Sequence, residues 1–367
     1  MIEVKELKNT KEFEIFSELA EHDHEQVVFC NDSETGLKAI IGIHNTVLGP
    51  ALGGTRMWNY PSDAAALNDV LRLARGMTYK ASISGLNLGG GKAVILGDAA
   101  KLKSEAFLRR FGRFVESLNG KYVTAEDVNM SPEDMEYISM ETRHVTGLSE
   151  SIGGGGDPSP VTAYGVYVGM KACAKKVYGS DSLEGKSISV QGVGHVGMYL
   201  LGYLAKENVK LYVSDYVRER AEEAASKFGA NAVGLDEVYD LDVDIYSPCA
   251  LGATINNDTI SRLQCQIIAG AANNQLDDES IHGEMLMKRG IAYAPDFLIN
   301  AGGLINVGID YLGGWNKERI YRKTEKIYQT TLDIFKLSEK EGIPTQNAAL
   351  RIAKKRIHEV GKVKRAL

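Results

Sequence analysis

The chain has 367 residues, and its 42 lysine and arginine against 48 aspartate and glutamate residues give a formal net charge of −6. This length favours two domains, because a single hydrophobic core stops growing at smaller sizes. A mildly acidic chain argues against non-specific nucleic-acid binding, which needs a basic surface. The sequence has no run of 18 apolar residues and no apolar stretch near its start, so we expect neither a membrane span nor a signal peptide.

Cysteine and glycine carry further information. Four cysteines without a C-x-x-C pair predict reduced thiols, a cytoplasmic protein and no metal site. Glycine is over-represented, at 39 of 367 residues against a typical share of about 7%. Clustered glycine indicates backbone that turns sharply or approaches another group closely. The clusters are Gly53–Gly54, Gly89–Gly91, Gly153–Gly156, the glycines at 192, 194 and 197, and Gly302–Gly303.

The first part of the chain contains predicted surface helices, a strand and a long helix. Residues 1–25 are polar and predict one or two surface helices, where His22 and His24 are typical of solvated side chains rather than of a metal site. Residues 38–44 predict a strand. Apolar residues recur at helical spacing over 63–80, behind a serine that can cap the first turn, and they predict a helix.

Three charged residues are candidates for acid–base chemistry. Lys92 follows three glycines, and close backbone would remove water from its ammonium group, which lowers the pKa of a lysine. Lys80, if it lies nearby, would lower that pKa further and favour a general base. Asp127 ends a predicted strand over 122–127 and is a candidate proton shuttle. Residues 153–160, with four glycines and two prolines, cannot be regular structure and predict a domain hinge.

The second half of the chain alternates helices with short apolar strands, which is typical of a parallel α/β sheet. A G-x-G-x-x-G sequence follows one predicted strand and opens a helix, and Asp215 ends the next strand. Gly192 would allow the tight turn, Gly194 the approach of a pyrophosphate, and Gly197 close helix–strand packing. The N–H groups that open the helix would face the phosphates. Asp215 would bind the adenosine ribose and repel a 2′-phosphate, which favours NAD over NADP.

These segments resemble the glutamate/leucine/phenylalanine/valine amino-acid dehydrogenases over nearly the whole chain, with the first dozen residues least covered. The leucine-specific branch is the most similar. The motifs that carry the resemblance are GPALGGTRMW at 49–58, RGMTYK at 75–80, GLNLGGGK at 85–92, TAED at 124–127, QGVG at 191–194, PCALG at 248–252 and NAGG at 300–303.

The resemblance implies an α/β fold of two domains separated by an active-site cleft. An N-terminal α/β substrate-binding and oligomerisation domain is expected over 1–147, completed by a C-terminal helix over 340–367. A Rossmann-type NAD-binding domain is expected over 148–339. Members of the family are homo-oligomers, octameric in the leucine-specific branch, so an octamer is expected. The implied cofactor is NAD, and we expect no metal and no nucleic-acid or membrane partner.

The resemblance also implies roles for single residues. Lys92 matches the catalytic base, and Asp127 matches a residue that assists proton transfer. Lys80 matches the lysine that binds the substrate carboxylate. Asn274 is expected near substrate and nicotinamide, and Thr162 at the nicotinamide carboxamide. Further contacts with the dinucleotide are expected from Gly192, Val193, Gly194, His195, Val196, Gly197, Asp215, Cys249 and Ala250.

The expected substrate is an aliphatic L-amino acid. Leu52 stands where glutamate-specific relatives carry a lysine that pairs with the second substrate carboxylate, and a buried carboxylate without a cation is costly. The residues expected around the substrate side chain are Leu52, Gly53, Met77, Ala125, Leu304 and Val307. They suit leucine, valine and isoleucine, so the implied reaction is NAD-dependent, reversible oxidative deamination of these amino acids to 2-oxo acids and ammonia.

Other functions stay open as alternatives. Some segments also resemble phenylalanine- and tryptophan-specific relatives, and Leu304 is bulkier than the valine usual in the leucine-specific branch, so the same reaction on an aromatic amino acid, or a valine dehydrogenase, is the alternative. A non-catalytic NAD-binding relative would lack the acid–base set, which is present here. Basic residues over 345–365, among them Lys354, Lys355 and Arg356, are expected to form a solvated face rather than a nucleic-acid surface.

Overall fold

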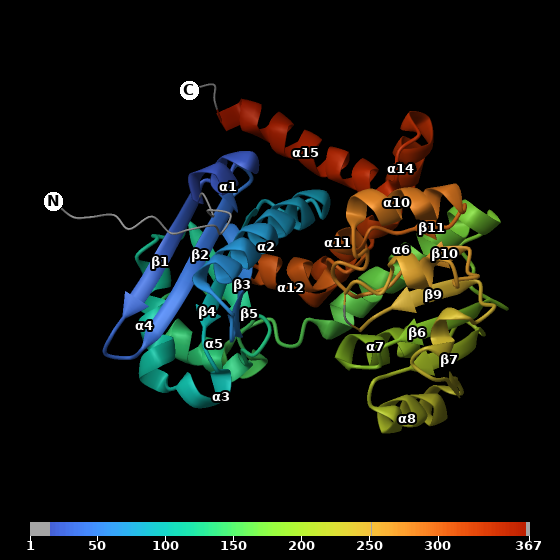
Figure 1. Ribbon diagram of the computed structural model, residues 1–367, viewed down its shortest axis with the longest axis horizontal. Helices are drawn as coiled ribbons and strands as arrows, with labels where there is room; N and C mark the ends of the chain where they lie inside the picture. Colours follow the sequence, from blue (N-terminus) through green and yellow to red (C-terminus); the bar gives the residue numbers. More distant parts are fainter. Residues whose placement is uncertain (1–14, 251, 365–367) are drawn as a thin grey trace, which may run out of the picture. The chain divides into compact units, whose positions relative to one another are not determined.

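A computed structural model describes residues 15–250 and 252–364 (Figure 1). The chain divides into two compact units, the first formed by residues 1–78 and 89–145 and the second by residues 79–88 and 146–367. Both units combine helices with a β-sheet, which confirms the predicted α/β class with two domains. The part of the predicted surface helices that falls on residues 1–14 lies outside the described residues. Across the described ranges, no helix has both the length and the apolar character needed to cross a membrane.

The first unit is built around β-strands from distant parts of the sequence. Its described residues form a five-stranded sheet in the order β1-β2-β4-β3-β5. β1 and β2 are antiparallel, as are β2 and β4, whereas β3 pairs in parallel with β4 and β5. The strands are β1 (Gln26–Asp32), β2 (Leu37–Asn45), β3 (Ala51–Trp58), β4 (Gly89–Leu96) and β5 (Tyr122–Glu126). The helices are α1 (Ile15–Glu21), α2 (Asp63–Ile83), α3 (Ala99–Leu102), α4 (Glu105–Glu116) and α5 (Pro132–Ser139), and the last turns of α2 belong to the second unit.

Two glycine clusters of the first unit lie where backbones approach each other closely. A Cβ atom at Gly53 would lie 1.7 Å from the carbonyl oxygen of Gly91 on the neighbouring strand. A Cβ atom at Gly90 would lie 2.0 Å from the backbone nitrogen of Thr78 on α2. Ordinary van der Waals contact between such atoms is about 3.5 Å, so neither position has room for a side chain. The prediction of close backbone approach is therefore confirmed here.

His24 is buried, and the expectation that it is a solvated residue is wrong. Its Nε2 lies 2.9 Å from the carbonyl oxygen of Leu71 on α2, and its ring meets the ring of His44 edge-on at 4.8 Å. The Nδ1 of His44 lies 2.8 Å from Oγ1 of Thr78, and its Nε2 lies 2.9 Å from the carbonyl oxygen of His22. Backbone and hydroxyl partners from distant elements thus replace the water that a surface histidine would bind.

The two buried imidazoles make the stability of the protein depend on pH. Burial, with a smaller contribution from the charge of His24, lowers the pKa of His44 to about 3, and burial also lowers the pKa of His24. In the unfolded chain a histidine has a pKa of about 6.5. The unfolded state therefore binds more protons between these values, and stability is lost as the pH falls below 6.5. We expect a loss of about 1.4 kcal/mol per pH unit for His44 alone.

Urea unfolding between pH 7.5 and pH 5.5 measures this dependence. The variant His44→Gln should show a slope smaller by about one proton. His358, which is exposed on α15, supplies the matched control. His358→Gln measures the effect of removing an exposed histidine, and a slope in His44→Gln no smaller than that of the wild-type protein would contradict the assignment.

The second unit contains a parallel sheet of the Rossmann type. In its described residues six strands pair in the order β11-β10-β9-β6-β7-β8, and every pair is parallel. This is the doubly wound order in which the chain runs outward from a central first strand, then returns to the other side of it. The switch lies between β6 and β9, where nucleotides bind in such sheets. The strands are β6 (Ser187–Gln191), β7 (Lys210–Ser214), β8 (Asn231–Ala232), β9 (Ile245–Pro248), β10 (Ile267–Ile268) and β11 (Ala292–Tyr293).

Helices and 3₁₀ turns connect these strands and form the end of the chain. The elements are η1 (Glu150–Ile152), α6 (Ser159–Tyr178), α7 (His195–Leu204), α8 (Arg218–Phe228), η2 (Glu237–Tyr239), α9 (Asn257–Ile260), α10 (Glu279–Lys288), α11 (Asp296–Ile299), α12 (Gly302–Tyr311), α13 (Lys317–Thr324), α14 (Lys326–Glu341) and α15 (Thr345–Lys364). α6 begins at Ser159, so the expectation of irregular structure through residue 160 is wrong for its last two residues. Pro160 is accommodated because the first turn of a helix does not use its N–H groups.

α15 falls in the second unit, whereas residues 340–367 were predicted to complete the first domain. Arg356 of this helix donates hydrogen bonds to the carbonyl oxygens of Ser82 (3.2 Å) and Leu86 (2.7 Å), and Ser82 donates to the carbonyl oxygen of Ala353. The expectation of a solvated face is therefore wrong for Arg356, although Lys354 and its neighbour at 355 are exposed. The functional domain boundaries stay a prediction.

Candidate functional site

The candidate acid–base centre is an ion pair in the first unit between Lys92 and Asp127. Lys92 lies within β4 and is 5% exposed, and its Nζ donates a hydrogen bond to Oδ2 of Asp127, which directly follows β5. The strand between them is β3, where Gly54 has no side chain. A Cβ atom at Gly54 would lie 2.9 Å from the Cβ of Asp127, so glycine leaves the room that Asp127 occupies. The two predicted residues are thus brought together.

Arg56 is a second cation at the same carboxylate, and it was not among the predicted site residues. Its Nε donates to Oδ2 of Asp127 at 3.2 Å, and its Nη1 donates to Asp69 at 3.2 Å. Asp69 also accepts a hydrogen bond of 2.7 Å from the hydroxyl of Tyr60. The signal that could have identified Arg56 is its place in the motif at 49–58. Asp69 lies in α2 and offers no comparable signal.

The pKa values of Lys92 and Asp127 are both lowered in this cluster, but for different reasons. Burial lowers the pKa of Lys92, Asp127 opposes that shift, and the charge of Arg56 adds to it. Burial by itself would raise the pKa of Asp127, but the charges of Lys92 and Arg56 together outweigh it and the pKa is lowered. Asp127 therefore stays a carboxylate, while Lys92 shares its only hydrogen-bonded counter-ion among the described residues with an arginine. The predicted lowering of the Lys92 pKa is confirmed, with Arg56 as the neighbouring cation.

Lys80 lies in the last turn of α2, which belongs to the second unit. Its Nζ lies 3.5 Å from the side-chain oxygen of Asn273, to which the Nδ2 of Asn300 donates at 2.8 Å. Asn300 belongs to the NAGG motif, so a residue of that motif binds the same side-chain oxygen that Lys80 contacts. That Lys80 and Lys92 act on the same substrate stays a prediction.

Asn274 lies in a turn that buried amides hold in place. Its backbone has a φ of 51°, and its side chain is exposed. Asn300 donates to the carbonyl oxygen of Ala271 at 3.1 Å, and Gln275 donates to the carbonyl oxygen of Gly270 at 2.8 Å. Left-handed backbone costs an asparagine less than most residues. The turn therefore presents Asn274 outward, and its contact with substrate and nicotinamide stays a prediction.

The aliphatic residues predicted around the substrate side chain come from both units. In the first unit, Leu52 and Ala125 are buried on the paired strands β3 and β5, and Met77 is half-buried on α2. In the second unit, Leu304 is buried and Val307 half-buried on α12. Their convergence on one substrate stays a prediction.

The glycine loop after β6 has the geometry that a dinucleotide requires. Gly192 has a φ of 98°, and a Cβ atom there would lie 2.7 Å from the backbone nitrogen of Ala250. A Cβ atom at Gly197 would lie 2.2 Å from the carbonyl oxygen of Gly192, so α7 packs tightly on the turn. At Gly194 a Cβ atom would meet no described atom within 4 Å, which leaves open space in front of the start of α7. The three glycines thus fit the turn, the packing and the approach of a pyrophosphate.

The other predicted contacts of the dinucleotide surround this loop. Asp215 follows β7 and accepts the N–H of Val193 at 2.8 Å and that of Val217 at 2.9 Å, so its carboxylate is fixed at the strand end. Cys249 and Ala250 follow β9, and the N–H of Cys249 donates to the carbonyl oxygen of Gln191 at 2.7 Å. The remaining three, His195, Val196 and Thr162, lie in the first turns of α7 and α6. These contacts with a dinucleotide stay predictions.

Known proteins match the chain at the level of family and of fold. Residues 24–144 match the dimerisation domain of Glu/Leu/Phe/Val dehydrogenases, and residues 204–365 match the Glutamate/Leucine/Phenylalanine/Valine dehydrogenase family. A leucine dehydrogenase from Thermoactinomyces intermedius is 55% identical over 350 residues, which cover 95% of this chain and 95% of that protein. An L-tryptophan dehydrogenase from Nostoc punctiforme is 49% identical over 94% of this chain and 96% of its own length.

A crystal structure of L-tryptophan dehydrogenase from Nostoc punctiforme superposes with a TM-score of 0.84 at 46% identity, covering 94% of this chain and 99% of that one. Both units are thus covered by these matches. The family has nicotinamide-dependent dehydrogenase chemistry, which agrees with the geometry of the glycine loop. The chain belongs to the glutamate/leucine/phenylalanine/valine dehydrogenase family.

Proposed function

We propose that this protein catalyses the NAD-dependent, reversible oxidative deamination of L-leucine, and also of valine and isoleucine, to the 2-oxo acid and ammonia. The observation that carries the proposal is the buried Lys92–Asp127 pair, whose carboxylate is also bound by Arg56. Such a pair supplies a lysine of lowered pKa next to a permanent proton acceptor. The 55% identity to leucine dehydrogenases supports the choice of substrate, because the tryptophan dehydrogenase is more distant at 49%.

The chain's own residues provide the acid–base steps. A bound nicotinamide would supply the acceptor for the α-hydride of the amino acid, and the substrate would then carry an iminium carbon. Lys92, uncharged, takes a proton from the water that adds to this carbon. Asp127 accepts that proton from Nζ of Lys92 and passes it to the amino group. As the C–N bond then breaks and ammonia leaves, Lys92, uncharged again, takes the proton of the hydroxyl group and the 2-oxo acid forms. Arg56 keeps Asp127 ionised between these transfers. We assign the binding of the substrate carboxylate to Lys80.

We also propose NAD rather than NADP as the cofactor. Two backbone N–H groups hold the Asp215 carboxylate at the end of β7, where the adenosine ribose lies in folds of this type. A fixed negative charge there hydrogen-bonds the ribose and repels a 2′-phosphate. Gly194 and the first N–H groups of α7 would face the pyrophosphate. Thr162 and Asn274 are assigned to the nicotinamide end.

The aliphatic specificity rests on side chains that carry no charge. Leu52 provides no cation for a second substrate carboxylate. Burying a neutral polar group without a partner costs roughly 2–7 kcal/mol, and burying an unpaired carboxylate costs more. Leu304 limits the room for an aromatic ring relative to a valine. An apolar pocket distinguishes one methylene by about 1–3 kcal/mol, so valine should be a slower substrate of the same site.

Initial rates of NADH formation with L-leucine, L-valine, L-phenylalanine, L-tryptophan and L-glutamate test the proposal. We expect the highest kcat/KM with leucine, valine lower by about 10- to 200-fold at most, and glutamate the poorest substrate. Replacing NAD⁺ by NADP⁺ should lower the rate with leucine. A preference for an aromatic amino acid or for glutamate would contradict the specificity. Absence of turnover with all five by folded protein would contradict the reaction.

The assembly and location complete the proposal. A homo-oligomer is supported by the match of residues 24–144 to a dimerisation domain, and we propose an octamer from the resemblance to leucine dehydrogenases. Four unpaired cysteines, three of them buried, support a reducing compartment such as the cytoplasm.

A further inference from the structure

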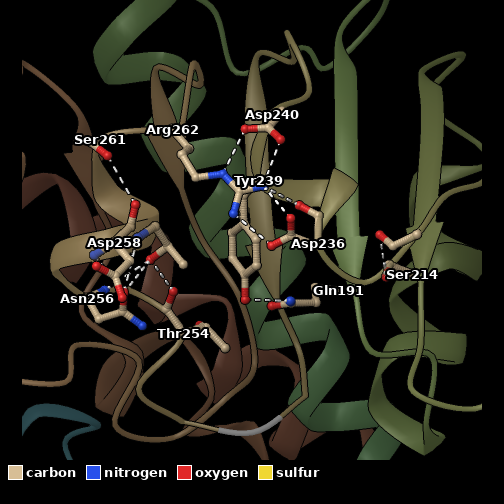
Figure 2. Close-up of polar contacts among 12 residues, drawn as sticks. Gln191, Ser214, Asp236, Tyr239, Asp240, Thr254, Asn256, Asp258, Ser261 and Arg262 are labelled. Carbon is tan, nitrogen blue, oxygen red and sulfur yellow. Dashed lines mark hydrogen bonds and ion pairs between the residues drawn. The ribbon is translucent and has the colours of Figure 1, made fainter.

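A cluster of polar contacts ties the short helix η2 to the sheet that carries the glycine loop (Figure 2). Asp236 and Asp240 flank η2, and Arg262 binds both of them. Its Nε and Nη2 donate to Asp240 at 2.8 and 2.7 Å, and its Nη1 and Nη2 donate to the carboxylate of Asp236 at 2.7 and 3.0 Å. Nη2 also donates to the carbonyl oxygen of Asp236 at 2.8 Å. One planar guanidinium therefore joins the two ends of η2.

Arg262 itself comes from a firmly capped turn. It follows α9, whose first turn is capped by Asn256, with the side-chain oxygen accepting the N–H groups of Asp258 and Thr259 at 3.0 and 3.1 Å. At the other end of α9, the Ser261 hydroxyl donates to the carbonyl oxygen of Asp258. Hydrogen bonding to Arg262 lowers the pKa of Asp236 and of Asp240, so both stay ionised at neutral pH. The guanidinium and its two carboxylates thus form an ion cluster that is attached to the capped helix α9.

From η2 one contact reaches the end of β6. The guanidinium carbon of Arg262 lies 5.5 Å from the centre of the Tyr239 ring, and the Tyr239 hydroxyl accepts a hydrogen bond of 2.8 Å from Nε2 of Gln191. Figure 2 shows the ring between the guanidinium and the amide. The side-chain oxygen of Gln191 accepts the hydroxyl of Tyr246 at 2.5 Å, so both ends of this buried amide are bound. Gln191 is the residue directly before Gly192.

A second contact from the same segment reaches the end of β7. The side chain of Glu237, the first residue of η2, accepts the N–H of Gly234 at 3.0 Å. The carbonyl oxygen of Gly234 accepts the hydroxyl of Ser214 at 3.3 Å (Figure 2). Ser214 is the residue directly before Asp215. Residues 234–239 therefore contact the last residue of β6 and the last residue of β7, the two strands that lead to the glycine loop and to Asp215.

We propose that Arg262 and Tyr239 are positioning residues for the dinucleotide, which hold the ends of β6 and β7 so that the glycine loop and Asp215 are preorganised for binding. The inference rests on the proposed function, since it assumes that a dinucleotide binds at this loop. Neither residue is assigned a contact with the cofactor. Their effect passes through Gln191 and Ser214, which fix where the turn begins and where the ribose-binding carboxylate lies. A preorganised site binds more tightly because less ordering accompanies binding.

Two variants separate the parts of this arrangement. Tyr239→Phe removes one hydroxyl and keeps the ring, so that Nε2 of Gln191 loses its partner. Arg262→Ala releases Asp236 and Asp240 together. We expect the NADH Kd to rise by about 3- to 10-fold in Tyr239→Phe and by at least as much in Arg262→Ala. KM for NAD⁺ should rise in parallel, with a smaller change in kcat at saturating NAD⁺. Because both residues act through one segment, the double variant should raise Kd by less than the product of the single effects.

The matched controls are residues with the same chemistry away from the glycine loop. The Tyr178 hydroxyl donates to the carbonyl oxygen of Asp244 at 3.4 Å. Asp244 lies directly before β9, whereas the residues proposed to contact the dinucleotide follow the other end of that strand. Arg109 of the first unit also binds two carboxylates, those of Glu105 and Glu141. Tyr178→Phe and Arg109→Ala should leave the NADH Kd at the wild-type value. Arg262→Lys should restore part of the affinity lost in Arg262→Ala, since an ammonium keeps the charge but not the two-sided geometry.

The experiment titrates NADH into each full-length variant, follows the change in NADH fluorescence, and records the melting temperature of every sample. An increase in Kd in Tyr239→Phe and Arg262→Ala, but not in the controls, supports the inference. A wild-type Kd in both variants overturns it. If the NADH Kd rises in proportion to the loss of melting temperature, and does so equally in variants and controls, the inference is also overturned, because the effect is then a general loss of stability. If the wild-type protein binds no NADH, the proposed function fails instead.

Discussion

Replacing Lys92 with methionine is expected to lower kcat for leucine oxidation by about 10³- to 10⁴-fold, at the upper end of what one acid–base group contributes. Methionine keeps most of the side-chain volume and removes the amine that takes the proton from water. The protein should still fold, because Asp127 keeps its hydrogen bond from Arg56 and is not left as an unpaired buried charge. The NADH Kd should stay near its wild-type value, since Lys92 is not among the residues proposed to bind the dinucleotide.

A matched pair in the same unit separates catalysis from stability. Lys103 donates to Asp134, which is buried, much as Lys92 donates to Asp127. Lys103→Met should lower the melting temperature and leave kcat near the wild-type value, because this pair is not part of the proposed site. Initial rates at saturating leucine and NAD⁺ measure both variants. If Lys92→Met retains roughly a tenth or more of kcat, the assignment of the base is wrong.

Replacing Gly53 with alanine is expected to destabilise the first unit by about 3 kcal/mol or more, enough to prevent folding of a marginally stable domain. The added Cβ would lie 1.7 Å from the carbonyl oxygen of Gly91 and 2.6 Å from its carbonyl carbon. Both atoms are backbone, so no side chain can rotate away, and β3 and β4 would have to separate. The carbonyl oxygen of Gly53 also accepts the buried hydroxyl of Tyr122 at 2.6 Å, which resists movement of β3 toward the other side.

Gly76 provides the opposite case in the same unit. It lies inside α2, and a Cβ atom there would meet no described atom within 4 Å. Gly76→Ala should therefore stabilise the protein by about 0.5–1 kcal/mol, the usual difference between glycine and alanine inside a helix. Thermal unfolding followed by circular dichroism compares the two variants. A Gly53→Ala protein with a wild-type melting temperature would contradict the close approach of β3 and β4.

The features that the sequence analysis predicted correctly are encoded over a few consecutive residues. The three glycines of the loop have the geometry expected from their spacing, and Asp215 lies at the end of the next strand, as the length of one β–α–β unit requires. The helix over 63–80 followed from apolar periodicity, which depends only on the repeat of the element itself, and the strand over 38–44 followed from a short apolar run. Local spacing is sufficient for such features, because the turn or helix that creates them is built from neighbouring residues.

The errors concern residues whose surroundings come from distant elements. A polar segment predicted a solvated His24, and a basic helix predicted a solvated Arg356, yet both side chains bind backbone carbonyl oxygens. Those oxygens belong to Leu71 and Leu86, which are 47 and 270 positions away in the sequence. Composition reports the average tendency of a segment to face water. It does not report which carbonyl groups the fold places beside one residue.

By itself, the sequence determined the family, the α/β class, the glycine loop and the identities of Lys92 and Asp127 as candidates. Only the tertiary structure decided that Arg56 binds Asp127, which lies 71 positions later in the sequence, and so shares this carboxylate with Lys92. It also decided that Gly53 leaves no room for a side chain. The physical reason is that electrostatics and steric exclusion act through space. Strand pairing and helix packing bring these groups within a few ångströms of each other, and motifs and periodicity describe each element without its partners.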